Sequence, residues 1–224
     1  MTKLINCAVI LAAGRGIRMR PLTDKIPKAM APYKGSTLIA NSIDKIKPFF
    51  NNIFVTVGYK GEVLAKHVIN NGATSVINTE GKGNAWWLYN SKINKFNEPL
   101  CVFTCDNIID TDYEKLIYEY NALEKPYCML VPTNPISGLE GDYIFTDENK
   151  IVTKLSRVEK SKIYCSGIQI LNPSMINKYT KKVDDFNKIW NQLILLKQLK
   201  ISSLLPDYWY AIDNLEQLKF VNES

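Results

Sequence analysis

The sequence has few or none of the residue patterns that several common functional classes require. Its single histidine, His67, lies in a polar segment beside Lys66, where we expect a surface or interhelical position rather than the base of a catalytic triad. Its five cysteines include no CxxC pair, so no paired-cysteine metal or redox motif is predicted. No apolar run approaches the roughly 18 residues that span a bilayer, and the lysines form no basic tract. Membrane and nucleic-acid partners are therefore not expected.

Arginine is also scarce. The chain has four arginines beside 24 lysines, with a formal net charge of +6. Three of the four, Arg15, Arg18 and Arg20, lie within one short segment. A guanidinium group binds phosphate oxygens in a planar, bidentate way that an ammonium group cannot match. The cluster therefore indicates a phosphate-binding segment.

Length and composition fit a globular protein. Of the 224 residues, 46% are hydrophobic and 22% are charged, and a chain of this size buries a sufficient core without disulfides. The odd number of cysteines and their place in apolar runs favour reduced thiols. The apolar start is short and runs into Gly14, Arg15 and Gly16, which argues against a secretory signal. We therefore predict a single domain, residues 1–224, in the cytoplasm.

Short apolar runs alternate with amphipathic segments over the first 140 residues. Strands are predicted at 7–11, 53–57, 75–77, 100–104 and 127–131. Helices are predicted from Thr37 onward and at 62–69, 84–93 and 112–122. The apolar strands are continuous rather than alternating, which is typical of a parallel sheet covered on both faces.

The pattern changes from about Gly141. A hairpin is predicted at 142–156 with its turn at 147–149, followed by a strand at 163–171, a helix from 184 or 185, a strand at 208–212 and a helix at 215–220. The predicted fold class is α/β, a Rossmann-like three-layer fold with a mostly parallel central sheet and an antiparallel C-terminal addition. The apolar helix expected at 186–199 has more apolar surface than one sheet can cover, so a homodimer is an open alternative.

The strand at 7–11 runs directly into a glycine-containing loop. Glycines at this point let the backbone approach a ligand and direct N–H groups at phosphate oxygens. Ligands of open α/β sheets bind beyond the carboxyl ends of the strands, where this loop must lie. The glycines alone would serve any tight turn, but the arginines and then Pro27 and Lys28 follow before the first helix.

This segment resembles the signature of the sugar-phosphate nucleotidyltransferases, also called nucleoside-diphosphate-sugar pyrophosphorylases. The matching positions are Leu11, Ala12, Ala13, Gly14, Gly16, Arg18, Met19, Pro21, Leu22, Thr23, Pro27, Lys28, Met30 and Pro32. The family joins a nucleoside triphosphate to a phosphorylated small molecule and releases pyrophosphate. The resemblance implies a nucleotide-binding core at 1–140 and an acceptor-binding part at 141–224.

The resemblance also assigns roles to residues of the loop. It implies that the nucleotide is held by Leu11, Ala12, Ala13, Gly14, Arg15 and Gly16, that Arg18 contacts the triphosphate, and that Lys28 reaches the reacting phosphates. Charge neutralisation and positioning are what such a transfer requires. One position departs from the family, since Ile17 replaces the usual Ser or Thr. Arg15 and Arg20 could equally be solvated surface residues.

Two aspartates are candidates for a metal site that the family uses for Mg²⁺, with Mn²⁺ as an option. Asp106 follows the apolar strand at 100–104, and a carboxylate facing a triphosphate needs a divalent cation between them. The second family carboxylate comes from a late strand, where this chain has Ala211 at the usual acidic position and Asp213 two residues later. Asp213 therefore supplies the second carboxylate, or caps the last helix and leaves one protein ligand.

Residues 157–160 resemble the family's Glu and Lys pair, in which the lysine binds the acceptor phosphate; here that lysine is Lys160. A solvated strand end is the other interpretation. In the base-binding region, Gly83 matches the glycine that lies against the base, and Asn84 is followed by Trp86 and Trp87. That run is similar to the choline-phosphate cytidylyltransferase branch.

We therefore predict a nucleotidyltransferase that transfers NMP from an NTP, most plausibly CTP, to a small phosphorylated acceptor, making an activated precursor for surface glycans or their decorations. A sugar-1-phosphate uridylyl-, guanylyl- or thymidylyltransferase is the alternative within the family. Ile17 and Ala211 keep a third hypothesis open, a catalytically silent nucleotide-binding regulatory subunit.

Overall fold

The structure, a computed structural model, describes residues 5–224, so residues 1–4 of the predicted domain lie outside the described residues. The chain forms two compact units. The first unit comprises Gly83–Val102 and Ile109–Trp209 with Ile5, and the second comprises Asn6–Lys82, Phe103–Ile108 and Tyr210–Ser224. Each unit therefore takes segments from distant parts of the sequence. The single domain with an internal division near residue 140 stays a prediction.

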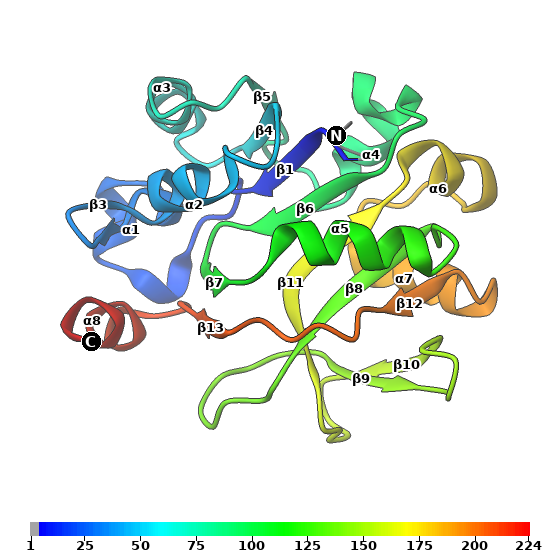
Figure 1. Cartoon of the computed structure of the whole chain (residues 1–224). Helices are drawn as coiled ribbons and strands as arrows, with labels where there is room; N and C mark the ends of the chain where they lie inside the picture. Colours follow the sequence, from blue (N-terminus) through cyan, green and yellow to red (C-terminus); the bar gives the residue numbers. More distant parts are fainter. Residues whose placement is uncertain (1–4) are drawn as a thin grey trace. The chain divides into compact units, whose positions relative to one another are not determined.

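The second unit contains most of the N-terminal elements and the last helix (Figure 1). Its elements are β1 (Cys7–Leu11), the 3-10 helix η1 (Ile17–Met19), α1 (Leu22–Lys25), the 3-10 helix η2 (Lys28–Met30), β2 (Pro32–Tyr33), β3 (Ser36–Thr37), α2 (Leu38–Ile46), β4 (Asn52–Val57), α3 (Gly61–Asn70), β5 (Ser75–Asn78) and α8 (Leu215–Glu223).

A parallel ladder of three strands forms the frame of this unit. β4 pairs in parallel with β1 on one side and with β5 on the other, and Ile10 lies opposite Val55 in the first pairing. Both residues are fully buried. α3 connects β4 to β5 and contacts both. The parallel arrangement and the burial of β1 and most of β4 confirm what the continuous apolar runs predict. β5 does not fit that expectation, because it is the last strand of the ladder and its residues are half-buried or exposed.

A hydrophobic cluster lies under the loop that follows β1. Its buried members are Met19, Ala31, Tyr33, Leu38, Ile108, Ile212, Leu218 and Val221. These residues come from the start, the middle and the end of the sequence, so the cluster exists only in the folded chain. Burying a side chain the size of Met or Ile contributes about 1.5–3 kcal/mol, and the cluster therefore fixes the segments that carry its members.

The first unit is mainly antiparallel. Its elements are α4 (Trp86–Asn90), the 3-10 helix η3 (Lys92–Lys95), α5 (Tyr113–Ala122), β8 (Cys128–Thr133), β9 (Tyr143–Thr146), β10 (Val152–Ser156), β11 (Tyr164–Leu171), α6 (Pro173–Tyr179), α7 (Phe186–Leu195) and β12 (Leu199–Ile201). β11 pairs antiparallel with β8 and β9, β9 and β10 form the predicted hairpin, and β12 pairs in parallel with β8.

Three strands contain residues of both units: β6 (Leu100–Thr104), β7 (Asn107–Asp110) and β13 (Tyr208–Ala211). β11 pairs antiparallel with β6 through the residues of β6 that belong to the first unit. The fold class is thus the predicted one, a mixed α/β fold with parallel strands and antiparallel strands added in the C-terminal half.

Several elements differ from the prediction. The helix predicted at 84–93 is two short pieces, α4 and η3, because the chain is extended at Ser91. The helix predicted at 186–199 ends at Leu195, since Lys197 adopts a left-handed φ of 55°. Leu199 belongs to β12 instead, so the apolar helix surface invoked for a homodimer is shorter than expected. α6 begins at Pro173 and has no counterpart in the prediction.

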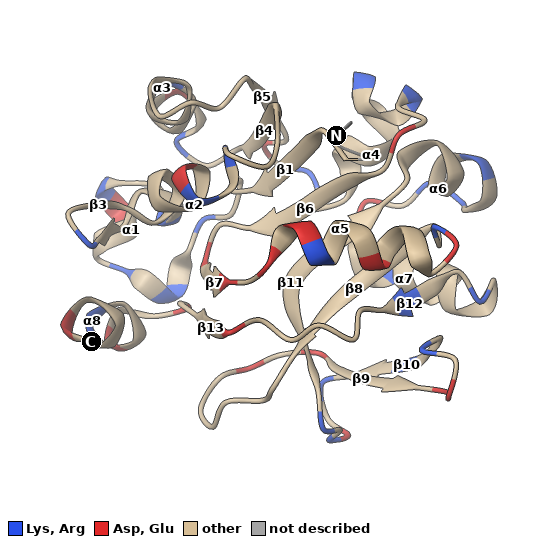
Figure 2. Cartoon of the chain, viewed as in Figure 1, with Lys and Arg blue, Asp and Glu red and all other residues tan. Residues whose placement is uncertain are grey.

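Among the residues that the structure describes, no helix combines the length and the apolar character needed to cross a membrane. All five cysteines are free thiols, as the sequence predicts. Figure 2 shows lysine, arginine and acidic residues on many helices, strands and loops of the chain.

Candidate active site

The loop after β1 is tied to the end of β4. The N–H of Ala12 donates to Oγ1 of Thr56 at 3.0 Å, and the N–H of Tyr59 donates to the carbonyl of Ala13 at 3.2 Å. A Cβ atom on Gly58 would lie 2.8 Å from the Ala13 carbonyl oxygen, so only glycine allows this approach. The first N–H of the loop is therefore used inside the protein.

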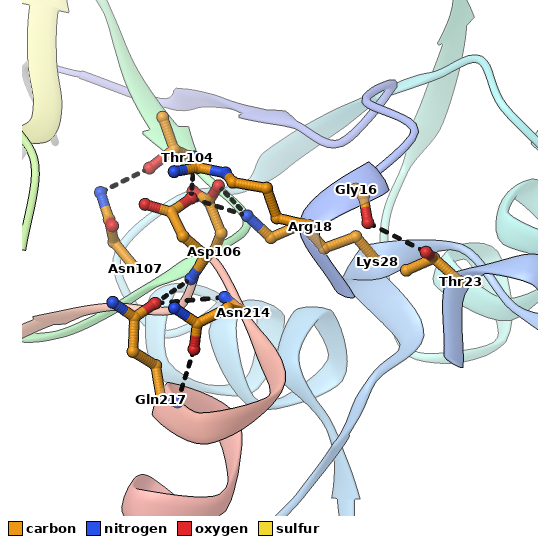
Figure 3. A network of polar contacts seen from close by, with 10 residues as sticks. Gly16, Arg18, Thr23, Lys28, Thr104, Asp106, Asn107, Asn214 and Gln217 are labelled. Carbon is orange, nitrogen blue, oxygen red and sulfur yellow. Dashed lines mark hydrogen bonds and ion pairs between the residues drawn. The ribbon is translucent and has the colours of Figure 1, made fainter. Parts of the chain in front are cut away.

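Gly16 has a structural role beyond that of a flexible turn residue. Its φ is 61°, and a Cβ atom at this position would lie 2.7 Å from Cβ of Lys28 and 3.1 Å from Cγ2 of Thr23. The hydroxyl of Thr23 donates to the carbonyl of Gly16 at 2.9 Å (Figure 3). The glycine thus lets the loop lie directly on the stem of the lysine that the sequence predicts to be catalytic.

Lys28 begins η2, which follows Pro27. Only 12% of its side chain is exposed, and its Nζ donates to Oδ2 of Asp106 at 2.7 Å and to Oδ1 of Asp213 at 3.2 Å. Burial by itself lowers the pKa of Lys28, but the neighbouring carboxylates of Asp106 and Asp213 outweigh burial, and the pKa is raised above its ordinary value. Lys28 is therefore a fixed positive charge at neutral pH.

Arg18 completes the group. It lies in η1, and its Nη2 is 2.8 Å from the same Asp213 Oδ1 that Lys28 contacts. Arg18 is 58% exposed and Asp213 is 18% exposed. Figure 3 shows Arg18, Lys28 and Asp106 directed toward one another from different segments. We call Arg18, Lys28, Asp106 and Asp213 the ion cluster; all four belong to the second unit.

Main-chain hydrogen bonds place the two carboxylates. Asp106 lies in the two-residue turn between β6 and β7, and the N–H of the preceding Cys105 donates to the carbonyl of Leu11, the last residue of β1. The N–H of Ile212 donates to the carbonyl of Asp106 at 2.8 Å. The turn carrying Asp106 is therefore bonded both to the start of the glycine loop and to the segment carrying Asp213.

The hydrophobic cluster supports the same arrangement. Met19 follows Arg18 directly, Ile108 lies two residues after Asp106, and Ile212 directly precedes Asp213. Met19 and Ile212 are fully buried. Arg18, Asp106 and Asp213 are thus each held close to a buried apolar residue, which restricts the geometry of the ion cluster.

The two carboxylates suit a hard divalent cation. Mg²⁺ prefers oxygen ligands and is commonly bound by one or two carboxylates together with substrate phosphates and water. Within residues 5–224, no group of three or more His, Cys, Asp and Glu side chains is placed to hold a metal. Asp106 and Asp213 are the side chains that could hold such a cation, and both carboxylates already contact positively charged groups.

The other arginines of the loop have different surroundings. The guanidinium of Arg15 lies 5.7 Å from the ring centroid of Tyr59. Nε of Arg20 pairs with Asp24 at 3.0 Å, with both side chains more than half exposed. Arg20 thus has the geometry of a surface residue, whereas Arg15 lies over a residue bonded to the glycine loop.

Gly83 and Asn84, predicted to contact the base, belong to the first unit. A Cβ atom on Gly83 would lie 2.0 Å from the carbonyl oxygen of Asp184, and Oδ1 of Asn84 accepts from the N–H of Phe186 at 3.0 Å. Trp87 is fully buried, and its Nε1 donates to the carbonyl of Asn84. Through these contacts, Gly83 and Asn84 join the segment before α4 to the start of α7.

Lys160 also lies in the first unit, far along the sequence from the glycine loop. It lines a cavity of about 390 Å³ together with Leu139, Glu140, Gly141, Tyr143, Arg157, Val158 and Tyr164. Nε of Arg157 pairs with Oδ1 of Asp142 at 2.9 Å. The cavity lining thus has charges of both signs, from Glu140, Arg157 and Lys160, beside two aromatic rings, since Tyr143 and Tyr164 pack edge to face with centroids 4.4 Å apart.

Comparison with known proteins identifies the family. The model of the nucleotidyl transferase family matches residues 7–222. The chain belongs to the nucleotidyl transferase family. The resemblance predicted from the glycine loop is thereby confirmed, and the match extends through the segment that carries Asp213.

Curated relatives of this nucleotidyl transferase are longer. The bifunctional protein GlmU of Methanococcus aeolicus is 28% identical over 209 residues, which cover 83% of this chain and 51% of that protein. Probable mannose-1-phosphate guanylyltransferase 2 of Arabidopsis thaliana is 26% identical over 224 residues, covering 92% of this chain and 61% of that protein. The chain spans about half the length of the GlmU relative.

Solved structures with the same fold match almost the whole chain. The inositol-1-phosphate CTP transferase from T. maritima superposes with a TM-score of 0.76 at 16% identity, covering 98% of this chain and 97% of that one. The CTP:phosphocholine cytidylyltransferase from Streptococcus pneumoniae gives a TM-score of 0.76 at 20% identity, covering 98% and 99%. At these identities the likeness shows the fold of this nucleotidyl transferase.

Sequence reasoning missed several residues of the site. Thr56, Gly58 and Tyr59 hold the glycine loop, and the hydroxyl of Tyr59 also donates to the carbonyl of Thr23 at 3.0 Å. The sequence signal that could have identified them is their position at the carboxyl end of the strand predicted at 53–57, where ligands of such sheets bind. It became informative only once the pairing of β1 with β4 was known.

Proposed function

We propose that this nucleotidyl transferase moves NMP from an NTP to the phosphate of a small phosphorylated acceptor and releases pyrophosphate. The observation that supports the proposal is the ion cluster beside the glycine loop. Lys28 and Arg18 lie within hydrogen-bond distance of the carboxylates of Asp106 and Asp213. Two cationic side chains beside two carboxylates are groups that could bind a polyphosphate substrate together with a divalent cation.

The proposed reaction is a displacement at phosphorus. An oxygen of the acceptor phosphate forms a bond to the α-phosphorus, the bond from that phosphorus to the bridging oxygen breaks, and pyrophosphate leaves with the electron pair. Two anions must approach each other, so the ammonium of Lys28 and the guanidinium of Arg18 would lower the barrier by neutralising charge. The chain needs no covalent nucleophile for this chemistry.

Asp106 and Asp213 would hold Mg²⁺, or Mn²⁺ in its place. When bound, the cation supplies positive charge to the phosphates and polarises them. The two carboxylates orient toward the position where Lys28 already places a positive charge, which supports this assignment. The glycine loop, with Gly14, Arg15 and Gly16, would contribute main-chain contacts to the nucleotide.

CTP is the proposed nucleotide. Two lines of support are the sequence around Asn84, Trp86 and Trp87 and the fold shared with two proteins named as CTP transferases. The names of the sequence relatives point to other nucleotides, since one is a guanylyltransferase. A sugar-1-phosphate uridylyl-, guanylyl- or thymidylyltransferase is therefore the alternative within the family.

The acceptor is proposed to bind in the cavity of the first unit, with Lys160 contacting its phosphate. The ammonium of Lys160 supports a phosphate contact, and the rings of Tyr143 and Tyr164 together with Glu140 support an apolar or cationic part in the same small molecule. The product would be an activated precursor for surface glycans or their decorations, made in the cytoplasm where nucleoside triphosphates are supplied.

A catalytically silent regulatory subunit is the candidate from another class. Ile17 is 59% exposed at a position where the family commonly has a hydroxyl, and Ala211, at the usual acidic position, is buried. These two residues favour nucleotide binding without turnover as the second candidate.

Two measurements test the proposal. Thermal shifts with CTP, UTP, GTP, dTTP and ATP in Mg²⁺ should show the largest stabilisation with CTP, because a ligand that binds only the folded chain raises its midpoint. Pyrophosphate release should then occur with CTP and one class among choline phosphate, inositol phosphate and hexose 1-phosphates. A shift with nucleotide but silence across all acceptors would favour the regulatory subunit.

A further inference from the structure

The start of α8 carries a second set of hydrogen bonds that bears on Asp213. Oε1 of Gln217 accepts from the N–H of Asp213 at 2.6 Å and from the N–H of Asn214 at 3.1 Å. In return, Oδ1 of Asn214 accepts from the N–H of Gln217 at 2.9 Å. The Gln217 and Asn214 pair is a capping box (Figure 3).

One of these bonds exceeds what a capping box needs. A capping box satisfies the N–H of the N-cap residue, here Asn214. Gln217 also accepts a hydrogen bond from the N–H of Asp213, the residue before the N-cap, and this bond is the shorter of the two. The side chain that caps the helix thus holds the main chain of the residue whose carboxylate contacts Arg18 and Lys28.

The main chain around Asp213 is held on its other side as well. The N–H of Ile212 donates to the carbonyl of Asp106, and Ile212 is fully buried. Asp213 therefore lies between a bond to the Asp106 turn and a bond to Gln217. Its carboxylate is only two rotatable bonds from this fixed main chain, so its position relative to Asp106 depends on both restraints.

We propose that Gln217 is a positioning residue, which holds the main chain of Asp213 so that its carboxylate meets Lys28, Arg18 and the phosphates. The catalytic part of this inference rests on the proposed nucleotidyl transfer. Gln217 is half-buried and acts through Asp213. The same sequence feature taken by itself indicates only a helix cap, worth about 1 kcal/mol to stability.

The experiment separates these two roles by comparing caps. Gln217→Met keeps the length of the side chain and removes the acceptor, whereas Gln217→Glu keeps an acceptor oxygen. Gln217→Asn, one methylene shorter, serves if the methionine variant does not fold. Asp112→Ala is the matched control, because Asp112 caps α5 by accepting from the N–H of Lys115 at 3.0 Å and belongs to the first unit.

The positioning role predicts a loss of turnover that stability does not explain. Measured at a temperature where every variant is folded, Gln217→Met should lower kcat for pyrophosphate release about 10-fold, since small displacements at a reacting centre are costly. Gln217→Glu should recover most of that loss, and Asp112→Ala should keep kcat within about twofold. A normal kcat in Gln217→Met would overturn the inference.

A second readout does not depend on activity. The unfolding free energies of wild type, Gln217→Met, Lys28→Met and the double variant form a cycle. If Gln217 positions Asp213 against Lys28, the two effects are non-additive, because part of the loss disappears once Lys28 lacks its ammonium. The cycle with Asp112→Ala should be additive. An additive Gln217 cycle overturns the inference. Absence of transfer by the wild type with every nucleotide would instead defeat the proposed function. The unfolding cycle would still test the positioning of Asp213 in that case, because it does not depend on activity.

Discussion

Gly16 and Lys28 lie so close that a Cβ atom on residue 16 would be 2.7 Å from Cβ of Lys28. The glycine loop and the buried lysine are therefore packed as one unit, and Thr23 adds a hydrogen bond to the Gly16 carbonyl. This contact gives a physical reason for a motif that couples a glycine to a lysine twelve positions later, because the glycine lets the loop pack against the side chain of Lys28.

Gly16→Ala should destabilise the fold, because it places a side chain at a φ of 61° and against the stem of Lys28. The expected loss of unfolding free energy is about 1–3 kcal/mol. Gly14→Ala is the matched control, since a Cβ atom there has no neighbour within 4 Å, and it should change stability by less than about 0.5 kcal/mol. Urea unfolding of both variants measures the difference; equal effects would mean that the loop moves away from Lys28 at no cost.

Asp106→Asn and Asp213→Asn should each lower turnover by about 100-fold or more, because each removes a carboxylate from the proposed cation site and a partner from Lys28. Pyrophosphate release at saturating NTP and Mg²⁺ measures this. Asp44→Asn is the control, since Asp44 is an exposed residue of α2 that pairs with Lys47. If Asp213→Asn retains normal turnover and normal Mg²⁺ dependence, Asp106 is the single protein ligand.

Arg18→Ala and Arg20→Ala should differ sharply although the two residues are neighbours in the sequence. Arg18 contacts the carboxylate of Asp213, and its removal should reduce kcat/KM for the NTP by about 100-fold. Arg20 pairs with Asp24 on an exposed face, and its removal should change kcat/KM by less than about threefold. Steady-state kinetics with the NTP varied gives both values. Comparable losses of kcat/KM in the two variants would contradict the prediction and would show that both arginines contribute to NTP binding through their charge.

Lys160→Ala should raise KM for the acceptor about 10-fold or more while leaving the thermal shift with nucleotide unchanged, because Lys160 lines the cavity assigned to the acceptor. Lys162→Ala carries the same charge change two residues away and should behave as wild type. A reduced nucleotide shift in Lys160→Ala would contradict the assignment of this cavity to the acceptor.

Stability should fall as the pH rises above about 8.5. Burial raises the pKa of the Cys105 thiol to about 12, with Asp106 adding to the effect, and burial also raises the pKa of Cys101 and Cys128. These thiols are neutral in the folded chain and ionise near pH 8.5 when it unfolds. Their contribution is therefore complete below pH 8.5 and is lost on the alkaline side, at about 1.4 kcal/mol per pH unit for each thiol.

Urea unfolding between pH 8 and 10 measures this slope below the range in which Lys28 titrates. Cys105→Ala should reduce the dependence of unfolding free energy on pH by the contribution of one thiol, about 1.4 kcal/mol per pH unit. A stability that stays flat over this range would show that the thiols are accessible to solvent.

Local patterns determined much of the fold. β1 and β6 begin and end at the predicted residues, and α2, α3 and α5 lie within one or two residues of prediction, because continuous apolar runs and helical spacing reflect burial directly. α4 is the contrast. Its predicted helix divides at Ser91, whose side chain caps η3 instead, and the packing of Trp87 against Asn84 is not a matter of periodicity.

The sequence by itself determined the family, the glycine loop and two positively charged residues of the site. Gly16, Arg18 and Lys28 lie in one contiguous segment, so their spacing can be recognised without knowledge of the tertiary structure. Only the tertiary structure decided that Asp106 and Asp213 meet Lys28, and that Thr56 and Gly58 hold the loop. Those contacts depend on strand pairing and on a hydrophobic cluster assembled from both ends of the chain. Contacts of this kind arise from packing, which no local spacing encodes.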